Sequence, residues 1–273
     1  MENKLYIPTD YVVTLPRGNK SYYNSINKKE IIAPLLDASR GYCMYCGKSL
    51  YNETDFIINL EHSVDKAGNE DQKEGDYKYL KHCKHNFSIS CPICNMVCKK
   101  SIEKVSMKDV PKTIECSKQN CDEQSCETYS YLREDYMKRN AIILQPRGVK
   151  KPDIYYRIGY DLLKNIYIPE IQGSDEEKDN PYHLFFIQNH INRFQLNGNR
   201  FSDCIIELCA DIVFLYENGV GSIDDIFSFF KGRHFSNILG ELFIEYLKIT
   251  FNGKEAEEMS EYCRLLVLLD SVN

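Results

Sequence analysis

The chain has 273 residues, 43% hydrophobic and 27% charged, which is ordinary for a globular protein and allows one large core or a small module beside a larger domain. The formal net charge of −6 argues against a protein that grips nucleic acid through bulk positive charge alone. No apolar run approaches the roughly 20 residues that cross a bilayer, and the start lacks a basic segment followed by an apolar one, so we expect a cytoplasmic protein with no membrane partner.

Residues 1–40 are the first of three regions and are expected to form an N-terminal arm. KKEIIAPLLDAS at 28–39 predicts a helix in this arm, in which Pro34 should lie near the start or kink the helix, because proline lacks the N–H that a helix interior uses. Residues 41–145 form a cysteine-rich module, and residues 146–273 a helical region.

Two C-x-x-C pairs occur among the 12 cysteines of the chain, CMYCG with Cys43 and Cys46 and CPICN with Cys91 and Cys94. Because no export signal is present, this spacing favours zinc over disulfides. Each pair fits a tight knuckle, and Gly47 supplies a permissive backbone after the first pair. Four cysteine ligands make a closed structural site, so we predict one structural Zn²⁺ that pins the intervening chain into a loop.

Other cysteines of the module leave a second zinc site open. Cys116, Cys121 and Cys126 are evenly spaced, with four residues between neighbours. They could bind zinc together with Cys98, with Cys83 or with a nearby histidine. This spacing is a weaker signal than the two C-x-x-C pairs, so the second site remains an alternative.

Two strand-like stretches lie between the knuckles, DFIINLEH at 55–62 and NFSISC at 86–91. AGNEDQKEGD at 67–76 lies between them and has the composition of a loop. After the second stretch, CPICNMVCKKSIEKV predicts a knuckle that continues into a helix. In the order strand, loop, strand, helix, the zinc would tie the strand ends together.

Polar side chains gather at the ends of these elements: Glu61 and His62 end the first strand, Asn86 begins the second, and Asn95 opens the helix. A neutral histidine can accept a proton from water at pH 7, which suits His62 to general-base catalysis. Carboxylate and amide oxygens, which Glu61 and Asn95 would supply, suit Mg²⁺ or Mn²⁺. Taken singly, these residues have plainer explanations: a solvated strand end, a structural histidine, a turn or a helix N-cap.

The ordered set C-x-x-C…(D/E)-H…N…C-x-x-C-N resembles the motif of the HNH, or ββα-metal, endonucleases. The resemblance implies an α+β fold, in which a zinc-stabilised ββα-metal module precedes a mostly α-helical C-terminal region. It also implies phosphodiester hydrolysis, with His62 and Asn86 as catalytic residues, the asparagine ordering the loop that aims the histidine. Glu61 and Asn95 would hold a catalytic Mg²⁺ or Mn²⁺.

The chain departs from this motif after its last asparagine. Many family members have a lysine or histidine shortly after that position, whereas here Cys98 intervenes and Lys99 follows. We expect Lys99 to bind phosphate, the alternative being a solvated helix face. His82 and His85 lie close to Asn86 and are either additional metal or phosphate contacts or exposed residues.

The last region has apolar residues at helical spacing in FFIQNHINRF, SDCIIELCADIVFLYENG and SNILGELFIEYLKITF. Cys204, Cys209 and Cys263 lie within apolar runs of this region and are expected to be small core residues. GSDEEKDNP at 173–181 is expected to be a mobile connection.

Several stretches resemble one branch of the motif, the PtuB nuclease subunit of Septu antiphage systems and its retron-associated relatives. They are LEHSVDK, with Asp65 where that branch has proline, YLKHCKHN, which lacks the tryptophan of that branch, AIILQPRGVKKPDIYY and FQLNGNRFSD. This resemblance implies DNA as substrate, an ABC/SMC-type ATPase subunit as partner, and residues 146–273 as its docking surface. The alternatives are an HNH nuclease that cleaves RNA and a catalytically inactive, zinc-stabilised binding module.

Overall fold

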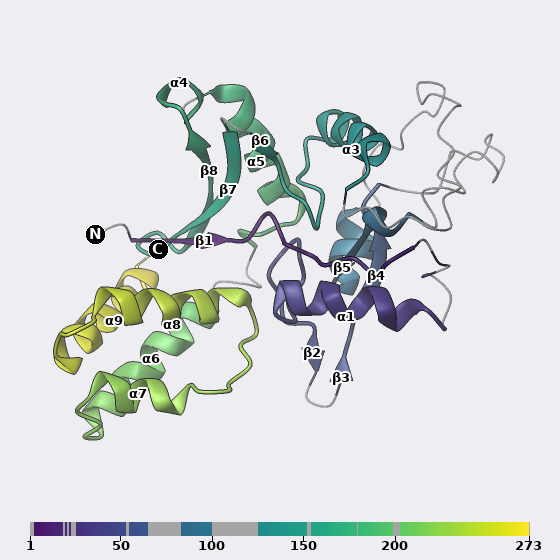
Figure 1. Ribbon diagram of the computed structural model, residues 1–273. Coiled ribbons are helices and arrows are strands. Elements are labelled where there is room, and N and C mark those ends of the chain that lie inside the picture. Colours follow the sequence, from purple (N-terminus) through teal and green to yellow (C-terminus); the bar gives the residue numbers. More distant parts are fainter. Residues whose placement is uncertain are drawn as a thin grey trace.

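The computed structural model describes residues 3–18, 20, 22, 26–52, 55–64, 83–99, 125–151, 154–178, 180–198 and 203–272. These residues form the predicted α+β fold with small antiparallel sheets. Figure 1 shows a hairpin module, an antiparallel sheet beside it, and a bundle of helices from the end of the chain.

The hairpin module is built on β4 (Asn59–His62) and β5 (Phe87–Ser90), which pair antiparallel. α1 (Lys28–Ser39) packs against β5 and has the predicted bounds. Pro34 lies inside this helix rather than near its start, so the helix gives up one backbone hydrogen bond there. Ile31 lies on the buried side of α1.

The prediction of one strand over residues 55–62 was wrong. β3 (Asp55–Phe56) pairs with β2 (Tyr51–Asn52), whereas β4 pairs with β5. Between them, the Ile57 N–H donates to the Leu50 carbonyl at 2.7 Å. This bond ties the chain to its own preceding segment, so the two halves of the stretch enter different hairpins.

The segment that follows β5 is helical from Pro92, a residue that suits a first helical turn. It continues as the π-helical turn η3 (Cys94–Cys98). Asn95 therefore lies within this turn. The prediction that Asn95 opens the helix was wrong. Residues 100–105 of the predicted helix and the predicted loop at 67–76 lie outside the described residues.

The larger sheet is antiparallel and is centred on β7 (Ile154–Asp161). β8 (Ile166–Gly173) pairs with β7 along the whole length of both strands. β6 (Lys150–Lys151) pairs with the first residues of β7, and β1 (Lys4–Ile7) pairs with its last residues. The C-terminal region is therefore not helical throughout. The two long strands are rich in isoleucine and tyrosine, which favour strand over helix, a signal that the prediction of a helical region overlooked.

The other α-helices of the described residues are α3 (Glu127–Asn140), α4 (Asp175–Lys178), α5 (Pro181–Arg193), α6 (Asp203–Glu217), α7 (Ile223–Phe229), α8 (Ile238–Thr250) and α9 (Ala256–Asp270). α5 packs on β7 and β8, and α6 packs against both α8 and α9. α4 occupies part of the stretch expected to be a mobile connection. The three cysteines expected in the core of this region are buried, as predicted.

The first cysteine knuckle is attached to the helical bundle through Asn237, the N-cap of α8. The Asn237 amide donates to the Cys46 carbonyl at 3.1 Å, and the Ile238 N–H donates to the Gly47 carbonyl at 2.8 Å. Gly47 has a φ of +69°, and a Cβ atom there would lie 2.7 Å from the Ile238 side chain. Glycine is therefore required both for the turn and for this close approach.

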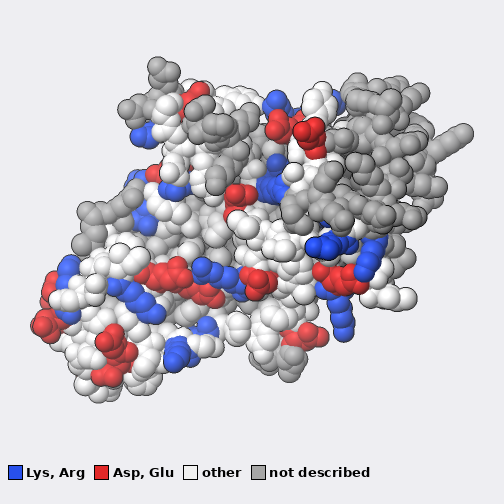
Figure 2. Space-filling model, viewed as in Figure 1, with Lys and Arg blue, Asp and Glu red and all other residues white. Residues whose placement is uncertain are grey.

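Charged side chains of both signs alternate over the described surface that Figure 2 shows. One such group joins the modules, because Arg40 at the end of α1 pairs with Glu241 and Glu245 of α8 at 3.5 and 2.9 Å. Within the described part of the chain, none of the helices combines the length and the apolar character that crossing a bilayer requires.

Candidate metal centre and active-site hairpin

The four predicted zinc ligands, Cys43, Cys46, Cys91 and Cys94, lie together in the interior. All are buried, and their ligand atoms lie within 4.8 Å of one another. The sulfurs of Cys46 and Cys91 are 3.8 Å apart. Bonds of about 2.3 Å at tetrahedral angles would place two zinc-bound sulfurs about 3.8 Å apart. The cluster therefore has the size and composition of a four-cysteine zinc site.

Backbone hydrogen bonds shape both knuckles. The Gly47 N–H donates to the Cys43 carbonyl at 2.9 Å, and the Asn95 N–H donates to the Cys91 carbonyl at 3.2 Å. Met44 joins the first knuckle to the hairpin, because its N–H donates to the Ile89 carbonyl of β5 at 3.3 Å. The cluster thus holds β5 against the segment that precedes β2.

The thiols of the cluster interact strongly with one another. Hydrogen bonds from Cys43, Cys46 and Cys94 hold the pKa of the Cys91 thiol far below its usual range. Hydrogen bonds with Cys43, the largest cause, and with Cys91 raise the pKa values of Cys46 and Cys94. One thiolate is therefore stabilised by its neighbours, and a dication at the centre would stabilise the remaining ones as well.

A second zinc site finds no support in the described residues. In the ranges that the structure describes, the four-cysteine cluster is the only group of three or more histidine, cysteine or acidic ligands close enough to share an ion. Cys98 is buried and Cys126 is half-buried, while Cys116 and Cys121 lie outside the described residues.

Glu61 is a buried carboxylate, with 3% of its surface exposed. Its Oε1 accepts a hydrogen bond from the Ser88 hydroxyl at 2.5 Å, and its Oε2 lies 3.1 Å from the Lys99 ammonium. Burial, and next the negative charge of Glu61, raise the pKa of Tyr45. Glu61 therefore belongs to a polar network inside the hairpin module and is not a solvated strand end.

Lys99 is buried in the same network. Its ammonium donates to the carbonyls of His62 and Ser63 at 2.9 and 3.1 Å. It also lies 5.5 Å from the centre of the Tyr45 ring. Lys99 is thus engaged with Glu61 and with the end of β4, and its predicted contact with phosphate stays a prediction.

His62 lies at the end of β4 with 8% of its surface exposed. It is opposite Phe87 in the hairpin, and the two rings are 4.9 Å apart. Glu61 is opposite Ser88, so Glu61 and His62 point to opposite faces of the strand. The half-buried Asn95 follows the predicted zinc ligand Cys94, and among the described residues no hydrogen bond joins its side chain to Glu61.

Asn86 is fully buried and holds the chain beside His62. Its amide oxygen accepts from the Val64 N–H at 2.8 Å, and its amide nitrogen donates to the Val64 carbonyl at 3.0 Å. The Ser63 N–H donates to the Asn86 carbonyl at 2.8 Å. These contacts hold the chain that follows His62 in place, while the part of Asn86 in catalysis stays a prediction.

We predict that Asn86→Ala lowers the free energy of unfolding by about 2–4 kcal/mol, because two hydrogen bonds are lost and the Val64 N–H and carbonyl stay buried without partners. Urea unfolding of the purified variants measures this change. Asn192→Ala on the exposed side of α5 is the matched control, and we expect it to unfold like the wild type. Equal stability of the two variants would contradict a structural role for Asn86.

Sequence reasoning missed several residues around the hairpin. The Ser88 hydroxyl donates to Glu61. Because side chains of a strand point to alternate faces, the two serines of FSIS share one face, and the position of Ser88 beside Glu61 could have been predicted from this periodicity. Ser63 donates to the Gln145 carbonyl, a contact across the chain that no local pattern indicates. His85 is buried rather than exposed, and burial, with the nearby charges of Arg147 and Lys84, lowers its pKa to about 4.

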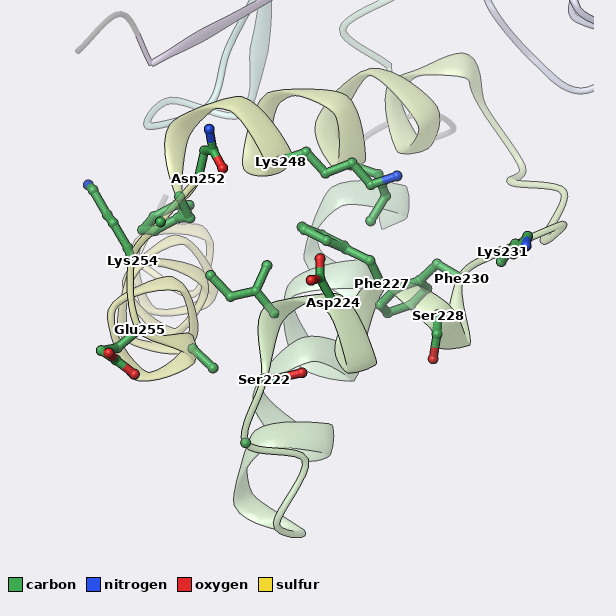
Figure 3. A pocket seen from close by; sticks show the side chains of 16 residues that line it. Ser222, Asp224, Phe227, Ser228, Phe230, Lys231, Lys248, Asn252, Lys254 and Glu255 are labelled. Atoms are coloured by element: carbon green, nitrogen blue, oxygen red, sulfur yellow. The ribbon is translucent and has the colours of Figure 1, made fainter.

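A separate pocket of about 890 Å³ lies in the helical bundle, between α7, the end of α8 and the start of α9. Figure 3 shows its lining, which includes Lys248 and Lys254. Their ammonium groups lie 5.3 and 5.0 Å from the rings of Phe227 and Phe251. None of the predicted site residues lines this pocket.

No protein-family model, curated protein or solved structure matches the chain. The predicted resemblance to HNH endonucleases therefore depends on the motif residues alone.

Proposed function

We propose that the protein is a metal-dependent HNH endonuclease that hydrolyses phosphodiester bonds of DNA. The main support is the four-cysteine cluster, which anchors both the hairpin that carries Glu61 and His62 and the turn that carries Asn95. Such an arrangement uses the structural zinc to place polar groups for chemistry without taking part in it.

The hairpin supplies distinct roles for its residues. His62 accepts the proton of the attacking water, and Asn86 limits the movement of the chain that follows His62 by holding Val64 at both its N–H and its carbonyl. Because Glu61 and His62 lie on opposite faces at the strand end, they would approach a scissile phosphate from different sides.

Glu61 and Asn95 would hold the Mg²⁺ or Mn²⁺ of the reaction. The observation that fits this role is Glu61 Oε2, which is buried and makes no hydrogen bond of good geometry, although Lys99 is 3.1 Å away. A carboxylate oxygen in this state retains a lone pair for a cation. When bound, such an ion stabilises the negative charge that develops on the phosphate and on the leaving oxygen.

We propose that the nuclease acts in the cytoplasm as the effector of a Septu-like antiphage system, together with an ABC/SMC-type ATPase. The net charge of −6 and the alternating surface charges support a partner that brings DNA to the hairpin. The helices after residue 180 would provide the docking surface, since they carry none of the predicted catalytic residues.

Cleavage assays test this proposal. The purified protein, with and without the proposed ATPase subunit, is incubated with plasmid DNA, single-stranded DNA and RNA in Mg²⁺, Mn²⁺ or EDTA. We expect DNA cleavage that requires a divalent ion and is lost in His62→Ala. Cleavage of RNA alone would support the RNA nuclease instead. If the wild type and His62→Ala give the same cleavage result on every substrate, the protein would instead be the catalytically inactive binding module.

A further inference from the structure

The Lys99 ammonium lies against the carboxylate that is proposed to bind the catalytic ion, 3.1 Å from Glu61 Oε2. Its side chain is 8% exposed and that of Glu61 is 1% exposed. Among the ion pairs of the described residues, Lys99 is the only partner of Glu61. The ammonium also donates hydrogen bonds to the backbone carbonyls of His62 and Ser63.

We infer that Lys99 is an internal cation that competes with the divalent ion for Glu61, an inference that rests on the proposed function. An ion bound to Glu61 Oε2 would lie a few ångströms from the Lys99 ammonium. Like charges at that separation repel strongly at the low effective dielectric of a protein interior. The ammonium and the ion therefore cannot both occupy this side of the carboxylate.

Displacement of Lys99 also affects the chain beside the catalytic histidine. When the ammonium leaves, the carbonyls of His62 and Ser63 lose the donor that holds them. Binding of the ion thereby loosens one of the attachments at the end of β4, while Asn86 still holds Val64. The freed ammonium becomes available to a phosphate, so the predicted phosphate contact of Lys99 depends on the ion being bound.

The competition has two consequences. Without the ion, Lys99 neutralises a buried carboxylate that would otherwise be unpaired and costly. When the ion binds, it must displace Lys99, and the free energy that this displacement costs lowers the affinity of Glu61 for the ion. Removing the positive charge should thus destabilise the ion-free protein and tighten ion binding at the same time. A lysine that only contacts phosphate would change neither property.

The test measures the binding of Mn²⁺ to the zinc-loaded full chain. The electron paramagnetic resonance signal of the free Mn²⁺ gives the fraction that is bound. We expect Lys99→Met to bind Mn²⁺ at least about tenfold more tightly than the wild type, because a repulsive neighbour is removed. We also expect a lower melting temperature for the ion-free variant and a larger rise on adding Mn²⁺. Lys99→Gln, which keeps a donor for the carbonyls, carries the same test if Lys99→Met does not fold.

Matched variants separate the possible failures. Lys248→Met, at an exposed lysine of α8, should bind Mn²⁺ like the wild type. Glu61→Gln should lose this binding, and Mn²⁺ affinity equal to that of the wild type would overturn the proposed role of Glu61. If both Lys99 variants bind Mn²⁺ no more tightly than the wild type, or if none of the proteins binds Mn²⁺, the proposed competition between Lys99 and the ion is wrong. Glu61→Gln combined with Lys99→Met should be more stable than Lys99→Met alone, because no unpaired buried charge remains.

Discussion

Cys91→Ser should leave the protein without its zinc and without a stable fold. A serine hydroxyl does not replace a thiolate ligand, and structural zinc sites have apparent binding free energies of about 10–16 kcal/mol that are coupled to folding. Cys91 directly follows β5, and its partner knuckle is the one that Asn237 joins to the helical bundle. Loss of the ion would therefore remove the link between β5 and the knuckle that is joined to the helical bundle.

Zinc content per chain and circular dichroism of the purified variant measure this outcome. Cys204→Ser is the matched control, because Cys204 is also buried but lies near the Asn237 carbonyl, to which a serine hydroxyl can donate. We expect this control to retain one zinc per chain and a cooperative unfolding transition. A folded, zinc-free Cys91→Ser protein that still cleaves its substrate would contradict the structural role of the cluster.

His62→Ala should abolish most cleavage while leaving the protein folded. Loss of a general base lowers rates by about 10²–10⁴-fold. The substitution removes the packing of the His62 ring beside Phe87, whereas the carbonyl that Lys99 holds belongs to the backbone and is kept. Single-turnover cleavage, zinc content and melting temperature separate a catalytic loss from a structural one.

His234→Ala is the control for His62→Ala. His234 is an exposed histidine that stacks on Tyr51, so its removal deletes an imidazole without touching the proposed site. We expect its cleavage rate to match that of the wild type. If both variants keep wild-type rates, His62 is not the base, and a parallel loss in both would point to a general effect on folding.

Local patterns explain why parts of this structure could be predicted. The C-x-x-C spacing determines the shape of each knuckle over a few residues, and the structure confirms that the two pairs meet. The helix over residues 28–39 was confirmed with its bounds, because its apolar spacing outweighs the interior proline. The cysteines of the helical bundle were confirmed as core for the same kind of reason, an apolar helix face.

Contacts between distant segments account for what could not be predicted. Lys99 meets Glu61 across 37 intervening positions, and only the folded hairpin shows that the lysine is buried beside it. The register of β4 with β5 likewise decides that Glu61 and His62 face opposite sides. The division of residues 55–62 between two hairpins depends on Leu50, which precedes the stretch.

A crystal structure with Zn²⁺ and Mn²⁺, with anomalous scattering measured at both absorption edges, tests the central claim most directly. The account predicts zinc bonded to four sulfurs at about 2.3 Å and manganese bonded to oxygens of Glu61 and Asn95, with the Lys99 ammonium moved away. Zinc absent from the four cysteines, or manganese bound elsewhere while Lys99 stays on Glu61, would contradict it.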